Sequence, residues 1–141
     1  MQLAALKSSN WGFIYFKNPN KRVRMAAIQR YAPNIQFIKN PSVDEQLRAV
    51  TDDPESFRFI RSPCNEAQVI AVRHNCHVYK SMKNPCEQAS IEVVKHHPNA
   101  ITWVKKPSKM VKWTAITHHP SSIVHIPDAS ESMKAAAIIC G

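Results

Sequence analysis

Glycine is almost absent from this sequence, with only Gly12 and Gly141 in 141 residues. Backbone loops that cradle phosphate groups need several glycines close together, so the sequence contains no such nucleotide-binding loop. Paired carboxylates are scarce as well, and the two pairs, Asp44-Glu45 and Asp52-Asp53, are explained by helix starts and caps. We therefore expect a protein that is not an enzyme.

Long hydrophobic runs are also missing. The longest, Ala135 to Cys140, is far shorter than the roughly 20 residues that cross a bilayer as a helix. Met1 to Asn10 has no apolar segment of the kind found in signal peptides. These absences lead us to expect a soluble, cytoplasmic protein that does not bind membranes.

The four cysteines form no Cys-x-x-Cys pair, so the sequence indicates neither a zinc knuckle nor a redox motif. Cys64 and Cys86 occupy equivalent places 22 residues apart, which in a helical stack separates them by roughly 8–10 Å, beyond the reach of a disulfide. We expect free thiols, and we predict no metal and no cofactor.

Carboxylates are absent from residues 1–43, which contain seven basic residues. The whole chain has 19 basic and 10 acidic residues and a formal net charge of +9. A charge of this sign favours anionic partners such as nucleic acid or an acidic protein surface.

What the sequence does contain is a repeat of 22 residues that runs through all of it. Proline recurs at this spacing at positions 19, 41, 63, 85 and 107, and alanine at positions 5, 27, 49, 71, 115 and 137. A fixed period of this length is typical of a stacked array, in which each unit buries its apolar face against the next. We predict one domain over residues 1–141, with units opening near 19, 41, 63, 85, 107 and 129.

Each unit is predicted to hold two helices. The first helix of each unit, of about eleven residues, is expected to have an Asn, Ser or Asp cap followed by proline at the first helical position, except that alanine follows the last cap. The expected caps are Asn18, Asn40, Ser62, Asn84 and Asp128. Glu87 and Glu131 would complete capping boxes three residues after such caps. A second helix of about seven residues is expected to follow another polar pair, as at Asp52-Asp53-Pro54. The fold class is all-α, a right-handed αα-solenoid of about six and a half two-helix units.

The unit Asn-Pro-Ser-x-x-x-Gln-Leu-x-Ala-Val, at Asn40 to Val50, resembles the leucine-rich variant type of short helical repeat, which is HEAT-like and occurs in uncharacterised phage and bacterial proteins. The resemblance covers essentially the whole chain and implies a superhelix that serves as a binding surface. It also suggests a phage accessory protein that acts on a host factor in the host cytoplasm. The cysteine cluster that holds an iron–sulfur centre in one such protein is missing here.

A basic residue recurs near the end of the second helix in five consecutive units. Two interpretations are open: the cations complement the helix dipole, or they form a stripe that binds phosphates. We call these residues the basic column: Lys17, Lys39, Arg61, Lys83 and Lys105. Four cations of the first helices are predicted to support it, namely Arg22, Arg24, Lys109 and Lys112.

An aromatic column lies two residues before the basic column, at Tyr15, Phe37, Phe59, Trp103 and His125, and is broken by Ser81. These rings are either core residues or a stacking platform for unpaired bases. A histidine column at 74, 96 and 118 is either a set of surface and capping residues or an addition to the positive stripe in acid. Metal binding by these histidines is disfavoured because equivalent positions lie one unit apart.

The last helix ends in Ala135-Ala-Ala-Ile-Ile-Cys140, which leaves two alternatives. Either Ile138 and Ile139 contact a partner or a second copy, or the helix turns its apolar side inward. We predict a noncatalytic binding module for an acidic macromolecule, either nucleic acid or a protein that handles it. The alternative is a protein–protein scaffold or self-assembling protein that uses its aromatic layer or its ends.

Overall fold

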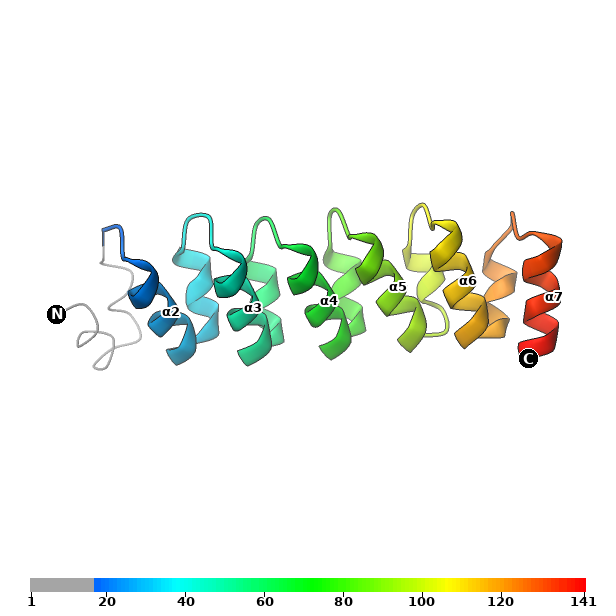
Figure 1. Ribbon diagram of the computed structural model, residues 1–141, viewed down its shortest axis with the longest axis horizontal. Coiled ribbons are helices and arrows are strands. Elements are labelled where there is room, and N and C mark those ends of the chain that lie inside the picture. The colour runs from blue at the N-terminus through cyan, green and yellow to red at the C-terminus, as the bar shows by residue number, and fades with distance from the viewer. Residues whose placement is uncertain (1–16) are drawn as a thin grey trace. The chain divides into compact units, whose positions relative to one another are not determined.

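The computed structural model describes residues 17–141, and helices account for all the regular secondary structure in that range. The chain divides into two compact units, residues 1–71 and 72–141. In each unit, α-helices alternate with short 3-10 helices (Figure 1). The all-α class is therefore confirmed for the described residues.

Unit 1 contains α2 (Lys21–Arg30), η2 (Ala32–Phe37), α3 (Val43–Asp52), η3 (Pro54–Phe59) and most of α4 (Asn65–His74). The helix α2 packs on α3, and η2 packs on η3, while each 3-10 helix also contacts an α-helix. The α-helices and the 3-10 helices of this unit thus form two layers.

Unit 2 contains the end of α4, followed by η4 (Cys76–Ser81), α5 (Glu87–His96), η5 (Ala100–Trp103), α6 (Lys109–His118), η6 (Pro120–His125) and α7 (Glu131–Cys140). The helix α6 packs against both α5 and α7, and η5 packs against η6. This unit has the same two layers.

The period of 22 is visible in the helix boundaries, because each α-helix from α2 to α7 begins 22 residues after the previous one. The members of the alanine column that the structure describes are buried, and Ala27, Ala49 and Ala71 completely so. A methyl side chain lets neighbouring helices approach closely, so larger residues at these positions would overfill the core.

The predicted helix caps are wrong by two residues. The side chains that accept a hydrogen bond from the first turn belong to Asn20, Ser42, Cys86, Ser108 and Ser130, each of which follows the expected cap rather than occupying it. The column proline is thus the residue directly before the cap and lies outside the helix.

Two further details of the helix starts differ from the prediction. Asn18 and Asn40, expected as caps, have left-handed φ angles of 51° and 55°, which asparagine tolerates better than most residues. Glu87 and Glu131 are the first residues of their helices and complete no capping box. The capping box that is present pairs Ser42 with Glu45.

The second helix of each repeat is a 3-10 helix of six residues, shortened to four in η5. Runs of this length suit 3-10 geometry, which is tighter and rarely extends further. The helices η2, η3, η4 and η5 each end two residues before a member of the basic column, which therefore lies beyond the helix.

Candidate nucleic-acid interface

Most cations on the α-helices of unit 1 are already paired with carboxylates. Lys21 Nζ lies 3.0 Å from Asp44 Oδ2, and Arg48 Nε lies 2.7 Å from Asp52 Oδ2. Arg24 Nε lies 2.9 Å from Oε1 of Glu45, whose side chain is fully buried. Arg24, predicted as a supporting cation, is therefore neutralised by a partner within the unit.

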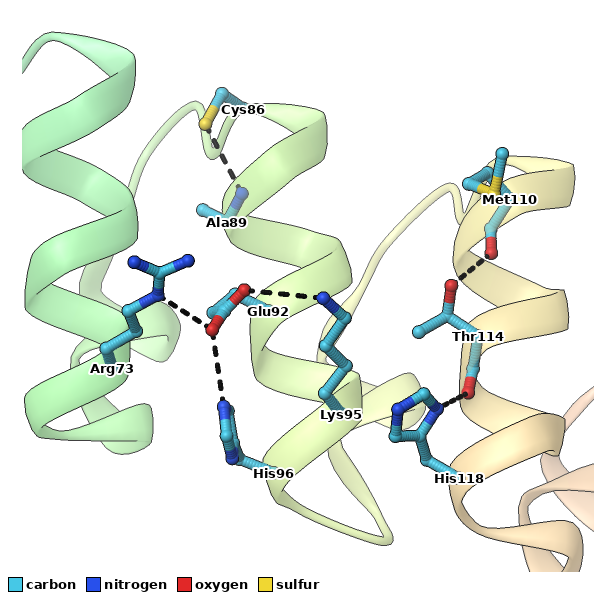
Figure 2. Close-up of polar contacts among 9 residues, drawn as sticks. All are labelled: Arg73, Cys86, Ala89, Glu92, Lys95, His96, Met110, Thr114 and His118. Atoms are coloured by element: carbon cyan, nitrogen blue, oxygen red, sulfur yellow. Dashed lines mark hydrogen bonds and ion pairs between the residues drawn. The ribbon is translucent and has the colours of Figure 1, made fainter.

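Unit 2 pairs its α-helical cations in the same way, around the buried carboxylate of Glu92 (Figure 2). Glu92 Oε1 accepts a hydrogen bond of 2.8 Å from Arg73 Nε and lies 3.3 Å from His96 Nε2, while Lys95 Nζ is 3.8 Å from Oε2. Burial alone would raise the pKa of Glu92, but the hydrogen bonds from Arg73 and His96 outweigh it, and the pKa is lowered.

The other supporting cations divide into two groups. Lys112 forms an ion pair with Asp128, and its side chain is only 16% exposed, so it has little freedom to meet a ligand. Arg22 and Lys109 are exposed, and neither has an ion pair with another described residue.

The basic column differs from these helical cations. All five members are exposed, and within residues 17–141 no carboxylate pairs with any of them. Lys39 and Arg61 each follow the C-cap residue of a 3-10 helix, Ile38 and Ile60. Because the dipole effect falls off within the last turn and a six-residue helix has a small dipole, complementing that dipole is a weak explanation for these cations.

In unit 1 the basic column and the aromatic column meet at one surface groove, which we call the Lys39–Arg61 groove. It has a volume of about 500 Å³, and its lining includes Phe37, Lys39, Gln46, Phe59 and Arg61. Among the residues that the structure describes, no acidic one lines the groove. The groove therefore combines two cations with two aromatic rings.

Gln46 lines this groove and joins the two loops that carry the cations. Its amide nitrogen donates to the carbonyl oxygens of Pro41 (3.1 Å) and Ser62 (3.4 Å), and its carbonyl oxygen accepts from the backbone N–H of Cys64 (2.8 Å). The side chain is only 6% exposed. These three contacts fix one loop relative to the other, and so help to set the positions of the two cations.

The two rings of the groove are not core residues. The ring of Phe37 is 44% exposed, in contrast to Phe57, which is 6% exposed and belongs to the core. The ring of Phe59 is half-buried and lies under the Arg58 guanidinium, whose carbon is 4.9 Å from the ring centroid. The core interpretation of the aromatic column is thus wrong for Phe37.

In unit 2 the corresponding ring, Trp103, is surrounded by polar side chains. Lys80 Nζ lies 4.2 Å from the ring centroid, and the centroids of His97 and His77 lie 4.7 Å and 5.5 Å away. The two imidazoles are themselves 5.8 Å apart. We call these four residues the Trp103 cluster. Tyr15, the first member of the aromatic column, lies outside the described residues.

Histidines of the predicted column take part in local hydrogen bonds. His96 contacts Glu92, and His118 Nδ1 lies 3.1 Å from the carbonyl oxygen of Thr114, as Figure 2 shows. His119 Nε2 lies 3.0 Å from the carbonyl oxygen of Lys95. Across residues 17–141, no three His, Cys, Asp or Glu side chains are grouped to hold a metal ion.

Sequence reasoning missed Gln46 and Lys80. A signal existed for the first, since Gln68 repeats it one period later and donates to the Pro63 carbonyl oxygen, as Gln46 does to Pro41. A signal existed for Lys80 as well, since Arg58 lies one period earlier and also lies over a ring of the aromatic column, that of Phe59.

Comparisons with protein-family models, with curated proteins and with solved structures gave no match for this chain. The resemblance to leucine-rich variant repeats therefore stays a prediction. None of the helices within residues 17–141 has the length and apolar character needed to cross a bilayer.

Proposed function

We propose that this protein is a noncatalytic binding module for an acidic macromolecule, with nucleic acid as the first candidate. One observation carries the proposal: cations on the α-helices are largely paired with carboxylates, whereas those of the basic column have no such partner among the described residues. Unpaired cations repeated along a chain are suited to phosphate contacts. A right-handed αα-solenoid of about six and a half units is the architecture we propose for presenting them.

The test compares two double variants of unit 1 that remove the same charge. Lys39→Gln/Arg61→Gln removes two cations of the groove, while Lys21→Gln/Arg48→Gln removes two that are paired within the unit. Binding to labelled single- and double-stranded DNA and RNA is measured by fluorescence anisotropy at several salt concentrations. We expect the groove variant to lose affinity and the slope of log K against log salt to become shallower by roughly 1.4 for a single strand.

The control double variant is expected to bind with nearly its original affinity. Equal losses in the two variants would mean that net charge alone attracts the ligand and that the basic column is not the site. No binding to any nucleic acid at low salt would rule out nucleic acid as the partner.

A second candidate function, self-association, rests on the last turn of α7. Ile138 and Ile139 are 80% and 82% exposed, so the alternative in which this helix turns these residues inward is wrong. Ile138 lines a hollow of about 450 Å³ together with Pro120 and Ile123. Changing both isoleucines to serine should abolish any concentration-dependent increase in mass seen by sedimentation; an unchanged mass would exclude these residues from the contact.

A further inference from the structure

We infer that the Lys39–Arg61 groove binds single-stranded nucleic acid, with backbone phosphates at Lys39 and Arg61 and a base stacked on the ring of Phe37. This inference rests on the proposed function and names the form of nucleic acid that the groove takes. It is carried by the charge of the groove, by its exposed ring and by its size.

The charge of the groove favours phosphate. Lys39 and Arg61 line it, no carboxylate does, and neither cation is paired with a described residue. The helices η2 and η3 pack together, which places the two cations one repeat apart, roughly the 8–10 Å of neighbouring helices. Two cations at this separation can contact different phosphates of the same strand.

The ring of Phe37 favours unpaired bases. It is 44% exposed, and no cation or second ring covers it among the residues that the structure describes. An exposed ring beside cations is the arrangement that binds single strands, because every base has a face that can stack. In a duplex those faces are stacked on one another, and a protein meets only base edges in the grooves.

An acidic peptide would make fewer kinds of contact with the same groove than a single strand. Its carboxylates could contact both cations, but aspartate and glutamate have no ring to stack on Phe37. The volume of about 500 Å³ lies within the roughly 300–1,000 Å³ of sites that hold small organic groups, which is enough for a base with its sugar. The hydrogen bonds of Gln46 connect the two loops that carry Lys39 and Arg61.

The same stacking site is closed in the Trp103 cluster. There Lys80 lies over the aromatic face, so the indole already has a cation as its partner. The inference therefore concerns the ring of Phe37 and does not extend to Trp103.

The experiment measures how the full-length protein and its Phe37→Leu variant bind a labelled oligothymidylate, a duplex of equal length and polyglutamate. Leucine keeps an apolar contact but removes the aromatic face. Tyr31→Leu is the matched control, since Tyr31 is 50% exposed in the same unit but does not line the groove. We expect Phe37→Leu to weaken binding of the single strand roughly 5- to 100-fold, the range for one stacked base, without changing its salt slope.

Phe37→Leu and Tyr31→Leu should bind the duplex with the same affinity. A cooperative thermal unfolding transition should show that Phe37→Leu is folded. If Phe37→Leu binds the single strand as the original protein does, while Lys39→Gln/Arg61→Gln does not, stacking is overturned and the proposed function stands. Equal affinity for the duplex and the single strand, or tighter binding of polyglutamate, also overturns the inference. Failure to bind any of the three polyanions overturns both proposals.

Discussion

The Lys39–Arg61 groove of unit 1 and the Trp103 cluster of unit 2 share one position of the repeat, that of the aromatic column, yet the rings of Phe37 and Trp103 have different surroundings. In the groove, Phe37 is exposed beside cations that have no partner among the described residues. In the cluster, a cation of the protein itself lies over Trp103, and two imidazoles lie beside it. A ring of the same column can therefore be left exposed or be covered by the protein's own side chains, and the neighbouring residues decide which.

The largest effect is expected from removing the Gln46 side chain, which joins the two loops of the groove. Gln46→Ala removes the partners of the Cys64 N–H and of the Pro41 and Ser62 carbonyl oxygens, which should lower the free energy of unfolding by about 2 kcal/mol. Urea denaturation measures this loss. Gln29→Ala, on an exposed site of α2, is the control and should change stability by less than about 0.5 kcal/mol.

A second prediction concerns the charge network of unit 2. The pKa of Glu92 is lower in the folded protein than its ordinary value of 4.5. The ionised carboxylate therefore contributes its full stabilisation at pH values above 4.5. This contribution is lost as the pH falls through the lowered pKa. Glu92→Gln should remove about 1 kcal/mol at neutral pH and flatten the acid limb of a stability-against-pH curve. An unchanged acid limb, matching that of the exposed control Glu55→Gln, would contradict the network.

A third prediction makes the Trp103 cluster more like the groove. Lys80→Ala uncovers one face of the indole and should lower stability by about 0.5–1 kcal/mol. In a variant with Trp11 and Trp113 changed to phenylalanine, acrylamide should quench Trp103 more strongly after this change. Lys83→Ala, which removes an exposed cation of the basic column, should leave quenching unaltered. Equal quenching in both would mean that Lys80 does not shield the ring.

The smallest effect is expected at a thiol next to the groove. Burial raises the pKa of Cys64, although the Ala67 N–H hydrogen bond acts in the opposite direction. Less thiolate is then present at pH 8, so in single-cysteine variants Cys64 should react several times more slowly with a disulfide reagent than the exposed Cys140. Equal rates in the folded protein would show that Cys64 is as accessible as Cys140.

The regular part of the fold could be predicted because each repeat contains the same apolar and alanine positions. Burial of Ala27, Ala49 and Ala71 follows directly from their column. The exact caps could not be predicted, because Asn40 and Ser42 are both good capping residues and only the left-handed φ of Asn40 decides between them.

The candidate site was predictable in part. The two columns placed Phe37 near Lys39 and Phe59 near Arg61, and these four residues do line one groove. The exposure of the Phe37 ring was not predictable from the sequence, since an aromatic residue on a short helix can lie either at the surface or in the core. The pairing of Arg24 and Lys112 also depends on contacts with Glu45 and Asp128 in the next repeat, which the charge pattern alone does not specify.

The pairing of each helix with its neighbours in sequence has a consequence for how quickly the units form. Within each unit, the packed elements are separated by one repeat or less, so only short loops must close before apolar surface is buried. Chains dominated by such local contacts have low contact order and fold on the order of microseconds to milliseconds. Each unit can therefore bury its core soon after its own residues have been synthesised, with little time for exposed apolar faces to associate with other chains.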